Sequence, residues 1–212
     1  VLESRETHHA EMGKESLATD LETIAADVLI LAQSDEFKGG VELAELRDKF
    51  LVFSKQRRFY DQVRFLDAAG MEAVRVNFNG GKPAIVPDSL LQDKSKRYYF
   101  GETIAMAGGE VYISDLDLNI EQGRIEQPLK PVLRVGTPVF GEGDDMIGVV
   151  LVNYLGARTI GRFDEALASS AGEAHLLNGD GFWLRGPRAE DEWGFMFGNK
   201  RSFAAAYPEA WR

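Results

Sequence analysis

The sequence contains no cysteine and only three histidines among its 212 residues. The lack of cysteine excludes disulfides, thiolate nucleophiles and sulfur-ligated zinc sites. Two of the histidines, His8 and His9, are adjacent in an N-terminal helical pattern, and His175 lies far away in a strand pattern. The sequence also has no Gly-x-Ser-x-Gly motif, no His-Glu-x-x-His motif and no loop that ends in Gly-Lys-Ser/Thr. These absences argue against an enzyme, and we expect no cofactor.

Acidic residues outnumber lysine and arginine by 34 to 24, and long apolar runs are missing. The formal net charge is −10, which argues against nucleic acid or an anionic membrane surface as a partner. A small anionic ligand is still possible, because one or two buried arginines can dominate a site locally. No apolar run approaches the 18 residues that span a bilayer, and no signal peptide precedes the helical pattern. We therefore expect membrane attachment only through flanking segments absent from this sequence.

Apolar residues make up 44% of the chain, enough for a packed core. The N-terminal part shows a heptad stripe, formed by Leu17, Leu21, Ile24, Val28 and Leu31. After Gly39 and Gly40 a second helical stripe follows, formed by Leu43, Leu46, Phe50 and Phe53. Such a stripe covers a sheet, or pairs a stalk with a second subunit, and the two roles are compatible. We expect a weak homodimer through the N-terminal helix.

From residue 60 the apolar period changes to two, which is typical of β-strands. Five strands are expected in one antiparallel sheet: 61–67, 73–78, 110–114, 132–140 and 147–154. Short helices are expected near 87–91 and over 99–106, and a polar connection over 116–131. A helix over 158–169 precedes a hairpin of 173–177 with 182–185, whose Asn178–Gly181 turn is a strong hairpin signal. The fold class is α+β.

An acidic stretch resembles the ligand spacing of a calcium loop. Its oxygen-bearing side chains stand at positions 1, 3, 5 and 12, namely Asp115, Asp117, Asn119 and Glu126. Ile120 occupies the position that requires glycine for the sharp turn, and the flanks are strands. The interpretation as a solvated acidic loop is therefore favoured over a metal site.

A second cluster has the composition of a small-ligand site. Arginine offers a bidentate fork to a carboxylate, and tyrosine provides an apolar wall with a polar tip. The cluster comprises Arg97, Tyr99 and Phe100, followed by Tyr112, Ser114, Asp115 and Arg134. The alternative is that Arg97 pairs with a surface acid while the tyrosines are ordinary core residues.

These motifs in this order resemble the double Cache (PAS-like) sensor domains. The matching pieces are an Arg-x-Tyr-Phe helix at 97–100, a Gly-Glu-Val-Tyr strand at 109–112, Thr-Pro-Val-Phe at 137–140 and Gly-Val-Val-Leu-Val-Asn at 148–153. The resemblance covers residues 17–167, with 173–212 as the start of a membrane-proximal module. Such domains lie outside the membrane in bacterial histidine kinases, chemoreceptors and cyclic-dinucleotide enzymes. The run 110–119, with 125–128 after it, is most similar to sensor histidine kinases.

The resemblance implies a ligand site between the sheet and the Arg97 helix, covered by the 116–131 connection. In amino-acid-binding members, an Arg-x-Trp-Tyr helix holds the ligand carboxylate and an Asp on the last strand takes the amine. This sequence has Arg97, Tyr99 and Phe100 in the helix but Asn153 at the Asp position. A neutral amide does not supply the charge that an ammonium prefers. We therefore expect a carboxylate or another polar metabolite without an ammonium group.

The expected organisation is a helical stalk over residues 1–55, a membrane-distal sensor domain over 56–165, and a connecting helix with an incomplete second module over 166–212. The expected function is extracytoplasmic sensing of a small molecule for a transmembrane histidine kinase, in the periplasmic part of an inner-membrane protein. The alternatives are a chemoreceptor, a diguanylate cyclase and a binding module without signalling.

Overall fold

A computed structural model describes residues 2–121, 123–168 and 174–211, without the side chains of residues 2–10, 166 and 167. His8, His9 and Leu167 therefore lie outside the described side chains, and Glu173 lies outside the described residues. By its contacts the chain forms two compact units. We call residues 21–114 with 133–155 the sheet unit, and residues 1–20, 115–132 and 156–212 the second unit. The predicted division into 1–55, 56–165 and 166–212 stays a prediction.

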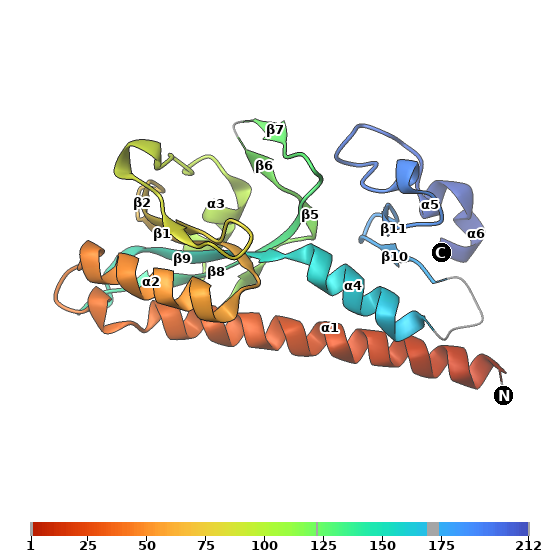
Figure 1. The fold of residues 1–212 in the computed structure, drawn as a ribbon, viewed down its shortest axis with the longest axis horizontal. Coiled ribbons are helices and arrows are strands. Elements are labelled where there is room, and N and C mark those ends of the chain that lie inside the picture. Colours follow the sequence, from red (N-terminus) through yellow and green to blue (C-terminus); the bar gives the residue numbers. More distant parts are fainter. Residues whose placement is uncertain (1, 122, 169–173, 212) are drawn as a thin grey trace. The chain divides into compact units, whose positions relative to one another are not determined.

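An antiparallel sheet forms the centre of the sheet unit (Figure 1). Its strands run in the order β3-β2-β1-β9-β8-β4, and β5 pairs separately with β8. The bounds are β1 Tyr60–Asp67, β2 Glu72–Asn77, β3 Ala84–Ile85, β4 Tyr112–Ile113, β5 Asp117–Leu118, β8 Pro131–Phe140 and β9 Met146–Leu155. The five expected strands are all present. The two additional strands, β3 and β5, have two residues each, too few to show a period in the sequence.

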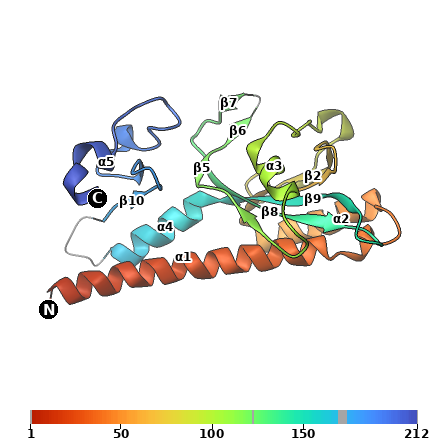
Figure 2. The ribbon, with the colours of Figure 1, turned by 180° about the vertical axis from the view of Figure 1, so that it is seen from behind.

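Two helices cover one face of the sheet, α1 (Leu2–Ala32) through its part in the sheet unit, and α2 (Leu43–Arg57) (Figure 2). A short 3-10 turn, η1 (Asp35–Phe37), connects them. The ring of Phe37 lies 4.9 Å from the ring of Phe65 on β1. Leu46 and Phe50 of α2 are fully buried. This face therefore carries the main apolar core, which the two helical stripes predicted.

The heptad stripe of α1 is part of this core. Ile24, Val28 and Leu31 are 1%, 0% and 1% exposed. The idea that these residues pair with a second subunit is therefore wrong, because their side chains already pack within the protomer. Leu17 and Leu21 are half-buried. The interpretation of the stripe as the cover of a sheet is the one that the structure supports.

A shorter helix, α3 (Tyr98–Ile104), covers the opposite face. Tyr99 and Phe100 pack with Leu66, Val149 and Leu151 in a buried cluster, against which Ile104 and Tyr112 also pack. Close approach depends on Gly136 of β8, because a Cβ there would lie 3.0 Å from Thr103 and 3.1 Å from Leu151. A 3-10 turn, η2 (Asp88–Leu90), stands where the first short helix was expected.

The second unit contains the remaining elements. Its helix α4 (Gly156–Leu167) forms an ion pair from Arg162 to Asp20 of α1. The expected hairpin is present as β10 (Leu176–Leu177) and β11 (Trp183–Arg185). The 3-10 turn η3 (Ala189–Asp191) and the helices α5 (Phe203–Ala206) and α6 (Pro208–Trp211) follow. The 116–131 connection contains an unexpected hairpin, β6 (Ile120–Glu121) with β7 (Arg124–Ile125).

The two isoleucines of α1 give a direct test of the packing. We expect Ile24→Ala to lower the free energy of unfolding by about 2–5 kcal/mol, because it leaves a cavity in the core. Ile30 is 62% exposed on the same helix, so Ile30→Ala should change stability by no more than about 0.5 kcal/mol. Urea denaturation of both variants measures the difference. Equal losses would contradict the assigned orientation of α1.

Candidate ligand-binding site

The sheet face below α3 is apolar at one end and polar at the other. Alternate residues of a strand point to the same face, so Gln62 and Arg64 share the face of Leu66, which packs in the α3 cluster. On β9, Asn153 lies directly opposite Gln62. Arg134 on β8 shares the face of Gly136, over which Thr103 of α3 packs. Local strand alternation therefore brings two arginines and two amides beneath the start of α3.

Arg64 is the centre of this polar region. It is 2% exposed, and its Nη2 donates to Asn153 Oδ1 at 2.5 Å. Its Nη1 lies 3.4 Å from the hydroxyl oxygen of Tyr99 and 3.7 Å from Glu72 Oε1. Its buried Nε has no hydrogen-bond partner among the described residues. A buried guanidinium with an unused donor is costly, and a ligand acceptor would remove that cost.

The ring of Tyr99 is surrounded by positive charge. The guanidinium carbons of Arg64, Arg97 and Arg134 lie 5.4, 5.6 and 5.2 Å from its centre. The three arginines come from β1, from the residue before α3 and from β8. Cation–π attraction holds each of them near the ring. Mutual repulsion of the three charges would be relieved by an anion between them.

The ionisation of Tyr99 reflects this environment. Burial by itself raises the pKa of its hydroxyl, but the charge and hydrogen bond of Arg64, with the charges of Lys94 and Arg97, outweigh burial. The net result is a lowered pKa. Positive potential at the Tyr99 hydroxyl favours any negative charge placed there, whether it belongs to a phenolate or to a ligand.

Glu72 on β2 is the buried carboxylate nearest to this region. Its Oε2 accepts hydrogen bonds from the backbone nitrogen of Gln92 at 3.1 Å and from Arg75 Nη1 at 3.4 Å. Among the described residues of the sheet unit, Asp27 is the other carboxylate that is buried. Asp27 belongs to the helix-covered face, where it binds Arg57 and Tyr60. Among the described residues of the sheet unit, buried cations therefore outnumber buried carboxylates on the α3 face.

The structure brings most of the predicted site residues together. Phe100 is in the α3 cluster, Tyr112 packs against it, and Tyr99, Arg97, Arg134 and Asn153 belong to the polar region. Arg97 is half-buried, its Nε is buried without a hydrogen-bond partner, and within the described residues it forms no ion pair. This observation argues against the alternative in which Arg97 pairs with a surface acid. Whether these residues bind a ligand stays a prediction.

Two predicted residues have other roles. The hydroxyl of Ser114 accepts a hydrogen bond from the backbone nitrogen of Arg134 at 2.9 Å, so it fixes the edge of the sheet. Asp115 is exposed and belongs to the second unit. The expected cover by residues 116–131 also lies in the second unit and stays a prediction.

The acidic loop does not have the arrangement of a calcium site. Asn119 uses its side-chain nitrogen to donate to Glu126 Oε2 at 2.8 Å, and Lys130 pairs with Glu126 at 2.6 Å. Asp115 is exposed, and Asp117 is in β5. Within the part of the chain that the structure describes, no group of three or more acidic or histidine side chains could hold a metal ion. The interpretation of this stretch as a solvated acidic loop stays a prediction.

The sequence interpretation overlooked Arg64, Glu72, Arg75 and Lys94. The signal for Arg64 was available, because Gln62 and Arg64 are the even-numbered polar residues of an otherwise buried strand. The sequence interpretation predicted the strand 61–67 without assigning a role to its polar residues. The partners of Arg64 are far away in sequence, and Asn153 is 89 residues from it.

A family comparison agrees with this architecture. Residues 24–212 match the family described as the sensor domain of bacterial histidine kinases. The chain is a histidine kinase sensor domain. A search of curated proteins finds no match. Among the described residues, no helix combines the length and apolarity needed to cross a membrane.

Solved structures with the same fold include sensor domains of several receptor types. A domain of a sensory box/GGDEF protein from Vibrio parahaemolyticus is 21% identical, with a TM-score of 0.78 over 98% of this chain and 81% of its own. The extracellular domain of the histidine kinase vpHK1S-Z8 is 21% identical, with a TM-score of 0.77 over 98% of this chain and 77% of its own. The amino-acid chemoreceptor PctC of Pseudomonas aeruginosa, solved with GABA, is 17% identical, with a TM-score of 0.62 over 94% of this chain and 78% of its own. The predicted Cache-type sensor fold is confirmed.

Tyrosine titration tests the electrostatics of the sensor domain. Tyr99 should ionise before Tyr60, because the nearby arginines lower the pKa of Tyr99, while burial and the hydrogen bond to Asp27 raise the pKa of Tyr60. Because folding lowers the pKa of Tyr99, its ionisation adds stability as pH rises through the folded pKa towards the unfolded one. Phenolate absorbance should lose its earliest step in Tyr99→Phe and keep it in Tyr60→Phe. An unchanged early step in Tyr99→Phe would contradict the positive potential.

Proposed function

We propose that the sensor domain binds a small organic carboxylate between the sheet and α3. The observation that carries this proposal is the group of three guanidiniums within 5.6 Å of the Tyr99 ring centre. Arg64 and Arg134 are each 2% exposed, so their charges are poorly screened by water. A carboxylate accepts the paired hydrogen bonds that a guanidinium donates. Arg97, half-buried at the start of α3, is the arginine that an incoming ligand reaches most easily.

The ligand that fits best carries no ammonium group. Asn153 is neutral, and its Oδ1 accepts a hydrogen bond from Arg64. Glu72 pairs with Arg64 through Oε1, and with Arg75 and the Gln92 backbone through Oε2. The related chemoreceptor domains solved with GABA, L-serine or isoleucine have amino compounds as ligands. We infer that this domain differs from them and prefers hydroxy or keto acids.

The proposed output is regulation of a histidine kinase across a membrane. We place the domain outside the cytoplasmic membrane, as the extracellular domain among its structural relatives suggests. Buried Asp27 connects α1 to the sheet, because Tyr60 of β1 donates to it at 2.6 Å and Arg57 of α2 pairs with it. Ligand binding on one face of the sheet would reach α1 through this link. The ligand shifts the signalling equilibrium only by its differential affinity for the two states.

A weak homodimer through α1 also belongs to this proposal. The buried positions Ile24 and Val28 are excluded as contacts, so exposed positions such as Ile30 would form the interface. Sedimentation at high protein concentration tests the association. A wild type that stays monomeric at every concentration would leave α1 with its core-packing role alone.

Replacing Arg97 tests the site. We expect Arg97→Ala to weaken lactate or pyruvate binding by about 1.5–3 kcal/mol, because one charge-assisted hydrogen-bonding group is lost. The fold should persist, since Arg97 forms no ion pair within the described residues. Arg47→Ala is the matched control, because Arg47 pairs with Asp88 at the surface. Calorimetric titration gives the affinities, and an unchanged affinity in Arg97→Ala would exclude Arg97 from the site.

Replacing Asn153 tests the ligand class. Asn153→Asp places a carboxylate beside Arg64, so lactate should bind about tenfold more weakly, equivalent to about 1.4 kcal/mol. Its amino-acid counterpart, alanine, should gain affinity because the new charge suits an ammonium. Titration of both proteins with both compounds measures the exchange of preference. Tighter binding of alanine than lactate by the wild type would show that the ammonium finds its charge elsewhere.

A further inference from the structure

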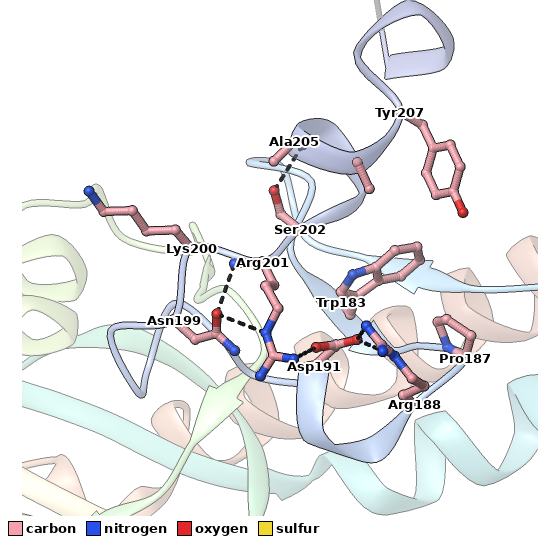
Figure 3. Close-up of a pocket in the computed structure, with 11 residues that line it drawn as sticks. Trp183, Pro187, Arg188, Asp191, Asn199, Lys200, Arg201, Ser202, Ala205 and Tyr207 are labelled. Carbon is pink, nitrogen blue, oxygen red and sulfur yellow. Dashed lines mark hydrogen bonds and ion pairs between the residues drawn. The ribbon is translucent and has the colours of Figure 1, made fainter.

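The second unit contains a cavity of about 600 Å³ beside the β10–β11 hairpin. Its lining comes from β11, the turn η3 and the segment that leads into α5 (Figure 3). The volume lies in the range of pockets that hold small organic molecules. The cavity is built entirely within the second unit and shares no residue with the Arg97 region.

One wall of the cavity is apolar. The Trp183 side chain forms its centre, and Figure 3 shows Pro187 and Tyr207 near the indole. Trp183 is buried, and the rings of His175 and Phe203 hold it edge-on at 5.1 and 5.5 Å. Because Trp183 is 5% exposed, most of the apolar surface that a ligand can contact comes from the exposed lining residues Pro187, Ala205 and Tyr207.

The opposite part of the cavity carries a charge cluster. Asp191 is 3% exposed and accepts from Arg188 Nε at 2.7 Å, and Arg201 Nη1 lies 2.9 Å from its other oxygen. Asn199 Oδ1 in turn accepts from the backbone nitrogen and Nε of Arg201. Both arginine side chains are more than half exposed. The carboxylate therefore orients two guanidiniums and leaves part of each free to meet a ligand.

The charge balance decides which ligand fits. The lining includes three cations, Arg188, Lys200 and Arg201, and one carboxylate, Asp191. Each oxygen of Asp191 already faces an arginine, which disfavours a cationic ligand there. Figure 3 shows the Lys200 chain directed away from the cluster, which leaves Arg188 and Arg201 as the contacts.

We propose that this cavity is a second ligand site for an amphipathic anion, a small carboxylate with an aromatic body. The body would pack against Pro187, Ala205, Tyr207 and the accessible part of Trp183, and the carboxylate would meet the exposed parts of Arg188 and Arg201. Guanidinium–carboxylate pairing provides the preference for an anion. Contact with the apolar wall provides the affinity for the ring. The site is independent of the one proposed beneath α3.

Three probes with one ring and different charge test the inference on the full chain. They are 3-phenylpropionate, the neutral 3-phenylpropan-1-ol and the cationic 3-phenylpropylamine. We expect 3-phenylpropionate to bind with a Kd below about 1 mM and to shift the Trp183 indole resonance. The neutral probe should bind about tenfold more weakly or worse, and the amine should leave the resonance unchanged.

Two arginine variants separate the cavity from other anion sites. Arg201→Gln should weaken 3-phenylpropionate binding about tenfold or more, while Asp191 keeps Arg188 as its partner. Arg185→Gln is the control, because Arg185 lies in the same hairpin but pairs with Asp164 and Glu192 outside the cavity lining. An unshifted Trp183 resonance, equal binding of the neutral probe, or binding lost in Arg97→Ala but kept in Arg201→Gln would each overturn the inference.

Discussion

The buried guanidinium of Arg64 is the constraint on which the α3 face depends. A charge at 2% exposure is costly unless it is paired, so Asn153, Tyr99 and Glu72 hold fixed positions around its two Nη atoms. Asn153 comes from β9, a central strand of the sheet, and Tyr99 comes from α3. The same interaction that orders the sheet therefore fixes the helix over it. A fold held in this way retains positive potential at the place where a ligand would enter.

The two faces of the sheet have different physical roles. The helix-covered face is almost entirely apolar, and Ile24, Val28 and Phe50 stabilise it by excluding water. The α3 face buries polar groups, which stabilise the fold less than apolar side chains would. The buried Nε of Arg64 has no hydrogen-bond partner among the described residues. Sites that violate the usual rules of burial are commonly functional. Asp27 is a buried charge on the helix side, where it connects α1 with the sheet through Tyr60.

Both proposed sites combine arginines with an aromatic side chain, but the two arrangements differ. Beneath α3, cations gather around the Tyr99 ring, and the nearest buried carboxylate, Glu72, is engaged by Arg75. In the second unit one carboxylate, Asp191, orients two arginines beside an indole. The first arrangement suits a compact anion, and the second suits an anion with an apolar body. A receptor with two such sites would respond to two chemically distinct signals, each through its own unit.

The sequence by itself determined the fold class and the five main strands, because periods of 3.6 and 2 record which residues share a buried face. The order of motifs along the chain also predicted Arg97, Tyr99 and Asn153 as ligand-binding residues, and that role stays a prediction. Periodicity does not say what covers a face, so only the tertiary structure showed that Ile24 and Val28 pack within their own protomer. Side-chain hydrogen bonds join residues that are far apart in sequence. The role of Arg64, held by a residue 89 positions away, was therefore decided by the folded chain alone.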